Sequence, residues 1–167
     1  SLGAGCLLLA QNALHLGLMR LEGVRRGAGR PRRIGCAVRL HGGVEELVAD
    51  EGAEKTFIVG APTSSPETSR YAEAYGLGTN AVRCVFVSNV SGVRVEGFTL
   101  TGGRTFDNSG SSGVDAMGAA VWSDTAETVV ADCIISNCVA VWAAAARNAT
   151  LVRCKVTENV SVNKRGV

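Results

Sequence analysis

The sequence predicts an all-β solenoid, a fold in which short strands and tight turns repeat along the chain. Three observations predict this fold: a strand pattern that recurs, many turn-forming residues and few aromatic side chains. The chain has 167 residues, of which 21 are glycines, and aromatic residues make up only 5%. Hydrophobic residues account for 46%, so we expect one domain with a buried core.

The recurring pattern is clearest in three segments whose apolar positions superpose. Apolar and mostly polar positions alternate within each segment, and a period of two is typical of half-buried strands. Glycine and asparagine recur just after the alternation, and both tolerate the positive φ of a tight turn. The segments are residues 95–103, 130–138 and 151–159, and their columns hold Phe98, Cys133 and Cys154, then Leu100, Ile135 and Val156, then Gly102, Asn137 and Glu158, then Gly103, Cys138 and Asn159.

A second strand precedes each segment and carries one aromatic residue. One unit therefore consists of strand, turn, strand and turn in about 21 residues. Because a unit of this size cannot bury its apolar face alone, we expect successive units to stack. The preceding strands are residues 84–88, 119–123 and 139–143, with Phe86, Trp122 and Trp142 as their aromatic residues.

This pattern resembles the right-handed parallel β-helix repeat proteins of the pectate-lyase-like superfamily, over residues 34–167. The tetrapeptides IISN (134–137) and VTEN (156–159) are similar to the FxxN element of polymorphic outer-membrane adhesins, and GAAV (118–121) is similar to their GGAI element. The resemblance implies a right-handed single-stranded parallel β-helix of about four coils. It also implies an extracellular or cell-surface protein.

Residues 1–33 have a different sequence pattern from the rest of the chain. Leucines at helical spacing predict an amphipathic helix near residues 6–21, which would cap the N-terminal end of the stack. The most hydrophobic run, residues 6–18, is too short to span a bilayer, and the remnant of a signal peptide is the alternative. We therefore expect no membrane-spanning segment in this chain.

An arginine-rich segment, residues 25–33, follows the predicted helix and contains glycine and proline, which break helices. It has two interpretations: an electrostatic patch for nucleic acid or acidic glycans, or a solvated linker. No aromatic side chain interleaves with the arginines, so bases have no stacking platform. We predict a linker and no nucleic-acid partner.

The second predicted region, residues 34–167, ends just after a strand. An uncapped solenoid leaves unpaired strand edges and an open core. We therefore expect this region to belong to a longer solenoid, followed by further β-helix coils or by a C-terminal domain.

Six cysteines and two histidines are present, without a CxxC pair, so we predict no zinc site. In stacked coils, Cys133 and Cys154 would lie one above the other inside the core. Two interpretations apply: small buried hydrophobic side chains, or a disulfide between coils in an exported protein. Asn137 and Asn159 would lie at neighbouring turns, where their amides can bond the backbone or each other.

Enzymes of the superfamily that this chain resembles place their sites outside one sheet, between long loops. The resemblance implies acidic residues that bind calcium or act as acid and base, with a basic residue nearby. The candidates are Asp107 and Asp115, with Arg104, in the loop at residues 104–117, and Asp124 on the next turn. This loop and the loop at residues 61–79 would form the walls of a cleft. The alternative is that these carboxylates are solvated loop residues. Calcium is the one cofactor that this interpretation adds.

Trp122 and Trp142 would recur on successive coils. If they point outward, they form a stacking platform for the sugar rings of a polysaccharide or cell-surface glycan, together with Arg104. If they point inward, they belong to the core. We predict a non-catalytic secreted or cell-surface module, adhesin-like or glycan-binding. The alternative is part of a polysaccharide lyase or glycoside hydrolase that acts on an acidic polysaccharide.

Overall fold

Parallel β-strands build the molecule. The computed structural model describes residues 35–40, 46–64, 74–106 and 114–162. Helical structure within these residues is confined to short turns, one of them the 3₁₀ turn η1 (Val114–Ala116). The strands are β1 (Gly35–Leu40), β2 (Glu46–Val48), β3 (Phe57–Val59), β4 (Val82–Val87), β5 (Arg94–Glu96), β6 (Thr99–Thr101), β7 (Val121–Ser123), β8 (Thr128–Ala131), β9 (Ile134–Ser136), β10 (Val139–Ala140), β11 (Ala146–Arg147), β12 (Ala149–Val152), β13 (Lys155–Thr157) and β14 (Val160–Ser161).

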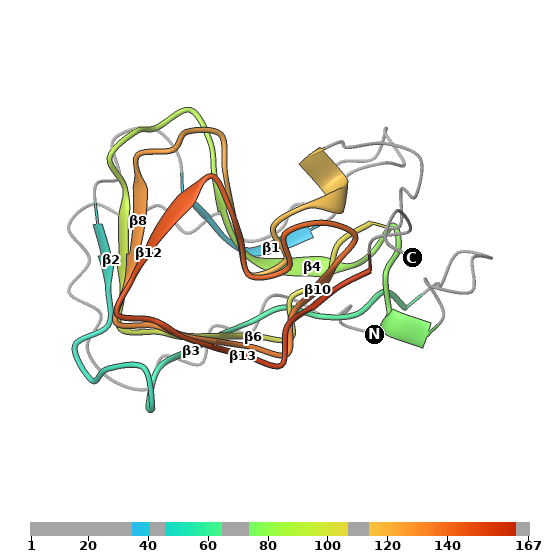
Figure 1. Cartoon of the computed structure of the whole chain (residues 1–167), viewed down its shortest axis with the longest axis horizontal. Coiled ribbons are helices and arrows are strands. Elements are labelled where there is room, and N and C mark those ends of the chain that lie inside the picture. The colour runs from blue at the N-terminus through green and yellow to red at the C-terminus, as the bar shows by residue number, and fades with distance from the viewer. Residues whose placement is uncertain (1–34, 41–45, 65–73, 107–113, 163–167) are drawn as a thin grey trace, which may run out of the picture.

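Within the described residues, these strands form three four-stranded sheets and one two-stranded sheet, and every pair is parallel. The sheet orders are β1-β4-β7-β11, β2-β5-β8-β12 and β3-β6-β9-β13, and β10 pairs with β14. Successive strands of the chain thus belong to different sheets. Figure 1 shows the three larger sheets around a common interior. The predicted all-β class with stacked parallel strands is confirmed, and the arrangement is consistent with a β-solenoid.

The strand register confirms the two apolar columns predicted from the sequence. Thr99 pairs with Ile134, which in turn pairs with Lys155. The preceding residues, Phe98, Cys133 and Cys154, therefore form one column, and Leu100, Ile135 and Val156 form the other. A slip of one residue would turn every buried side chain of a strand outward, so burial of one face specifies this register.

The turns between sheets use aligned residues with positive φ. This left-handed backbone bends the chain sharply, and glycine and asparagine adopt it at the least cost. The predicted turn column is confirmed, and a second such column lies between the β5-β8-β12 strands and the β6-β9-β13 strands. The predicted column has Gly102, Asn137 and Glu158 at φ of 69°, 51° and 56°, and the second has Gly97, Asp132 and Arg153 at 77°, 49° and 51°.

One asparagine side chain ties two turns together through the backbone. The Oδ1 atom of Asn159 accepts the Cys138 N–H at 3.0 Å, and its Nδ2 donates to the Ile135 carbonyl at 2.9 Å. The oxygen and the nitrogen of the Asn159 amide are thus both bonded to the backbone of the preceding coil. The predicted bonding of turn asparagines to the backbone is confirmed for Asn159.

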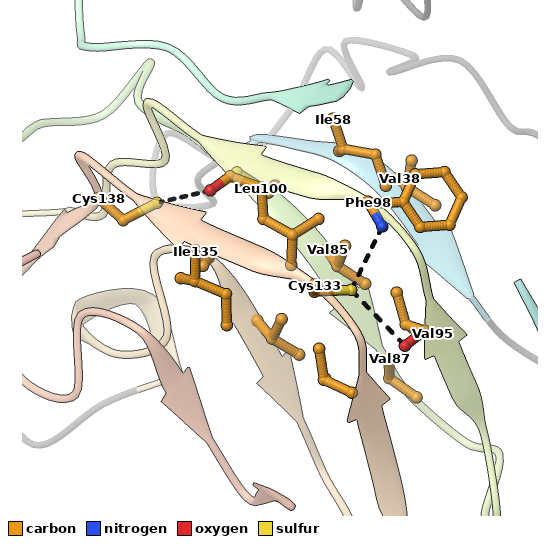
Figure 2. Packing of buried hydrophobic residues seen from close by; sticks show 14 of the residues in the cluster. Val38, Ile58, Val85, Val87, Val95, Phe98, Leu100, Cys133, Ile135 and Cys138 are labelled. Carbon is orange, nitrogen blue, oxygen red and sulfur yellow. Dashed lines mark hydrogen bonds between the residues drawn. The ribbon is translucent and has the colours of Figure 1, made fainter. Parts of the chain in front are cut away.

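Small and branched side chains fill the interior. Val85, Val95, Leu100 and Ile135 are completely buried. Figure 2 shows them converging from different strands on one cluster with Phe98. Removal of this apolar surface from water is the main force that holds the sheets together.

Inward-facing side chains of the last strands are exposed. Val156 shares a column with the buried Ile135 but is 45% exposed, and Leu151, aligned with the buried Val130, is 36% exposed. A side chain in a stack is covered on both sides only where a strand lies on each side. The last described strands therefore present an apolar surface and unpaired strand edges.

The predicted alignment of Trp142 with Trp122 is wrong. Trp122 in β7 pairs with Arg147 in β11, whereas Trp142 forms an isolated bridge with Met117. Residues 139–143 resemble residues 119–123 locally, but β10 at their start belongs to the two-stranded sheet. Pairing with β7 begins only at Ala146 in β11. The small side chains of residues 144–146 pack in the core with Ala119 and Ala120.

Some predictions fall outside the described residues. These are the capping helix near residues 6–21, the arginine-rich segment at residues 25–33 and Asp107. None of the helical turns in the described part of the chain has the length and hydrophobicity that a membrane crossing needs.

Candidate functional site

A column of cationic and aromatic side chains follows the outer face of the β1-β4-β7-β11 sheet. Arg39 pairs with Phe86, Phe86 with Trp122, and Trp122 with Arg147. The neighbouring positions on these strands point inward, since Val38, Leu40, Val85, Val87 and Val121 are buried. Side chains alternate across a strand, so the four residues lie on the other face. We call Arg39, Phe86, Trp122 and Arg147 the outer column.

The two aromatic rings of the outer column are stacked. Their centroids lie 4.6 Å apart and their planes differ by 9°. The guanidinium carbon of Arg39 lies 4.7 Å from the Phe86 centroid, and that of Arg83 lies 5.2 Å from it. An aromatic pair contributes about 0.5–1.5 kcal/mol beyond burial, and a cation–π contact about 0.5–1 kcal/mol at an exposed site and about 2 kcal/mol where the cation is buried, as Arg83 is. These contacts hold the rings in one orientation.

Cations stand at both ends of the outer column. Arg39 is half-buried and Arg147 is exposed. Arg147 donates to the Asn148 Oδ1 at 2.6 Å, a neutral acceptor that leaves its charge uncompensated. Within the described residues, the ion pairs join Arg94 to Glu96 and Arg153 to Asp132, and so do not involve the outer column. A guanidinium in this state can bind a carboxylate or sulfate with two parallel hydrogen bonds.

The stacking limits how Trp122 can meet a sugar ring. One face of its indole lies against Phe86, and Arg147 is the next residue of the column on the other side, so a sugar would meet the edge of the half-buried ring. Trp142 is half-buried elsewhere, against a separate apolar cluster with Leu77, Val139 and Val141. The structure therefore does not bring the two tryptophans into one column.

The described acidic candidates lie on opposite sides of β7 in the chain. Asp115 is in η1 and is half-buried, and its carbonyl accepts the Phe106 N–H at 2.9 Å. Asp124 follows β7 and is exposed, and its Oδ2 accepts the Asn89 N–H at 2.6 Å. Asp124 thus ties its own turn to the turn of the preceding strand. In the part of the chain that the structure describes, no three His, Cys, Asp or Glu side chains gather as a metal site.

Arg104 lies apart from the outer column, at the turn after β6. Its Nε donates to the Tyr75 carbonyl at 3.0 Å, and its Nη1 donates to the carbonyls of Gly103 at 3.0 Å and Asn137 at 2.6 Å. Burial lowers the pKa of this guanidinium. The Arg104 side chain therefore links the turns after β6 and β9 through hydrogen bonds.

The sequence pattern pointed to two of the four outer-column residues, Phe86 and Trp122, but not to Arg39 and Arg147. No local signal marks those arginines, because each reaches the column through pairing with a strand far away in the chain. The aligned aromatic residues were the signal that the sequence offered. The strand pairing then shows that Arg39 and Arg147 continue the same column on either side of them.

No protein-family model matches the chain, and neither a curated protein nor a solved structure matches it. A function therefore has to be inferred from the residues of the chain itself. The outer column is the surface feature with the most specific chemistry.

Proposed function

We propose that this chain is a non-catalytic module of a secreted or cell-surface protein, and that it binds an acidic glycan along the outer column. The observation that carries the proposal is the alignment of Arg39, Phe86, Trp122 and Arg147 on one outward face. Its cations would pair with carboxylates or sulfates of the glycan. The edges of the stacked rings would contact the apolar faces of the sugars.

Strand spacing favours a polymer over a single sugar. Neighbouring strands lie about 4.8 Å apart, so three steps from Arg39 to Arg147 cover roughly 14 Å. A chain of several sugars with regularly placed anionic groups would meet both arginines at once. Binding at two linked points raises the overall affinity above that of either point alone.

The fold in which we place this surface is a right-handed parallel β-helix similar to the pectate-lyase-like proteins and to adhesin repeats. Four strands in each of the three larger sheets support four coils in the described residues. Parallel crossovers are right-handed in nearly all proteins, which supports the hand. Further coils or a C-terminal domain would cover the apolar surface at Leu151 and Val156.

A binding assay with matched polysaccharides tests the proposal. The protein would be titrated with polygalacturonate, heparin and uncharged dextran at low and high salt. We expect binding to an acidic polymer that weakens with salt, and no binding to dextran. Arg147→Ala should weaken binding up to about fivefold and Arg147→Glu further, since a surface ion pair contributes up to about 1 kcal/mol. Lys155→Ala and Lys155→Glu, at an exposed cation on another sheet, are the matched controls.

Equal losses in the Arg147 and Lys155 variants would show non-specific attraction and contradict the proposal. Cleavage is followed in the same mixtures, with calcium and with chelator, by counting new reducing ends. Release of reducing ends that Asp115→Ala or Asp124→Ala abolishes would support the alternative, a polysaccharide lyase or glycoside hydrolase.

A further inference from the structure

Two buried cysteines, Cys84 and Cys138, converge on one strand. Cys84 lies in β4, and Cys138 lies in the turn between β9 and β10, and both are completely buried. The Cys84 Sγ donates to the Thr101 carbonyl at 3.3 Å. The Cys138 Sγ lies 3.4 Å from the Ser136 carbonyl and 3.9 Å from the Leu100 carbonyl, and Figure 2 shows the contact with Leu100. Both sulfurs therefore lie close to adjacent carbonyls of β6.

The missing side chain of Gly103 leaves room for the Ala119 carbonyl and for the Cys84 sulfur. Gly103 precedes Cys138 in the same column, one strand spacing away. A Cβ atom at Gly103 would lie only 3.2 Å from the Cys84 Sγ. The Ala119 carbonyl oxygen would lie nearer still, at 2.1 Å, so this carbonyl occupies the space of a Gly103 side chain and the Cys84 sulfur lies beside it. The two sulfurs are neighbours across one interval of the stack.

The other pair of described cysteines has a different geometry. Cys133 and Cys154 are stacked directly in one column, so the strand spacing of about 4.8 Å sets their separation. Disulfides need Cβ atoms about 3.5–4.5 Å apart, which directly stacked positions exceed. Each of these thiols instead lies near a carbonyl of the preceding coil. The Cys133 Sγ is 3.8 Å from the Val95 carbonyl, and the Cys154 Sγ is 3.3 Å from the Val130 carbonyl.

We propose that Cys84 and Cys138 form an intrachain disulfide when the chain folds in an oxidising compartment, and that this bond locks β4 to the turn after β9. The bond would join two neighbouring coils of the stack. It would lie near the outer column, because β4 also carries Phe86. Its existence does not depend on glycan binding.

The surroundings of the pair favour this reaction. Direct contact with the Cys84 thiol lowers the pKa of Cys138, and the charge of Arg104 acts in the same direction, whereas burial opposes both. Burial raises the pKa of Cys84 well above its usual value. Cys138 is thus the sulfur that more readily becomes a thiolate, and thiolates are the nucleophiles in disulfide exchange.

The oxidant is a small-molecule disulfide such as oxidised glutathione. The Cys138 thiolate attacks one glutathione sulfur, so that a mixed disulfide forms and one glutathione thiolate leaves. Cys84 loses its proton and attacks the Cys138 sulfur, which releases the second glutathione thiolate. Two cysteine thiols become one disulfide, and one glutathione disulfide becomes two glutathione thiols. Because both sulfurs are buried in the folded protein, glutathione reaches Cys138 when the turn at the exposed Asn137 opens locally.

Refolding followed by peptide mapping tests the proposal. The full chain would be unfolded in urea with reductant, refolded in a mixture of reduced and oxidised glutathione, alkylated and digested with trypsin. Trypsin leaves Cys84 in peptide 84–94, and it leaves Cys133 and Cys138 together in peptide 105–147. The Cys133→Ala variant serves as the mapping background, since its peptide 105–147 contains Cys138 as the sole cysteine. We expect peptides 84–94 and 105–147 to be linked, with a loss of two hydrogens per chain.

Matched variants in the same background check the assignment. Cys138→Ala should abolish the link, and so should Cys84→Ala. Wild-type protein, which does not depend on any variant's folding, should show the same linked peptides, with fragmentation placing the bond at Cys138. Thiols that all stay reduced, a link from peptide 105–147 to the Cys154 peptide, or bonds between chains alone would each overturn the proposal.

Discussion

The Phe86 and Trp122 rings lie parallel on neighbouring strands, with 4.6 Å between their centroids and 9° between their planes. Each ring comes from a separate strand of one parallel sheet, β4 or β7. A cation follows on either side, Arg39 beyond Phe86 and Arg147 beyond Trp122. Parallel in-register pairing therefore converts single residues far apart in the chain into one continuous surface column.

The two stacked rings should stabilise the fold cooperatively. We expect Phe86→Leu and Trp122→Leu to be less than additive in a double-mutant cycle, with a coupling energy of about 0.5–1.5 kcal/mol. Urea unfolding of the two single variants and the double variant measures it. Phe86→Leu combined with Trp142→Leu is the control pair, since Trp142 packs in another cluster. Additive losses in the first pair would contradict a stabilising stack.

Glu158 sits in a turn column at a φ of 56°, where its preceding neighbours are Asn137 and Gly102. Asparagine tolerates this backbone better than glutamate does. We expect Glu158→Asn to raise the free energy of unfolding by several tenths of a kcal/mol, up to about 1 kcal/mol, and β-branched Glu158→Thr to lower it. Chemical unfolding measures both. The side chain is exposed, so a change in burial does not confuse the result.

Asn159 pairs both groups of its amide with the backbone of the preceding turn. Asn159→Asp keeps the acceptor for the Cys138 N–H but replaces the donor to the Ile135 carbonyl with an oxygen. We expect this variant to lose about 1–3 kcal/mol of stability at neutral pH, because two oxygens then face each other. Asn163→Asp, the same exchange close by in the sequence, is the comparison. Equal unfolding midpoints for Asn159→Asp and wild type would contradict the bridging role.

Val130 and Val156 are the same residue type on inward positions, but Val130 is completely buried and Val156 is 45% exposed. Val130→Ala should cost about 2 kcal/mol, from the lost transfer free energy and the cavity. Val156→Ala should cost less than half as much, because its side chain already contacts water. The difference between the two unfolding midpoints measures how open the last strands are. Comparable losses would mean that Val156 is covered in solution.

The ion pair of Asp132 and Arg153 should make stability depend on pH. The hydrogen bond from Arg153, whose Nε lies 2.7 Å from the Asp132 Oδ1, lowers the pKa of Asp132. A depressed folded-state pKa stabilises the protein above the unfolded value of about 3.9, and the effect is lost as the pH falls through the folded value. The difference in midpoint between wild type and Arg153→Met should therefore be larger at about pH 6 than at about pH 2. A difference of equal size at both pH values would exclude the charge as its cause.

The columns of the repeated strands could be predicted from the sequence alone. Phe98, Cys133 and Cys154 share one column and Leu100, Ile135 and Val156 the other, as their period of two and their neighbouring turn residues indicated. The positive φ at Gly102, Asn137 and Glu158 followed from the same alignment. These features are predictable because a half-buried strand and a tight turn impose local requirements on side chains.

The candidate site was predictable only in part. The aromatic residues Phe86 and Trp122 were aligned correctly, but Trp142 was placed beside Trp122, where Arg147 lies. Two short stretches with similar residues cannot reveal which of them continues a sheet. That choice depends on how tightly the alanine-rich chain packs against Ala119 and Ala120, which is a property of the folded core.

Short stacked strands and turns of positive φ follow from the sequence of this protein, because alternation and turn chemistry act over a few residues. The positions of Arg39 and Arg147 on either side of two stacked rings, and of Cys84 near Cys138, become visible only in the folded chain. Both groupings join residues separated by loops of unequal length. Hydrogen-bond pairing between distant strands sets such contacts, and no local period in the sequence encodes them.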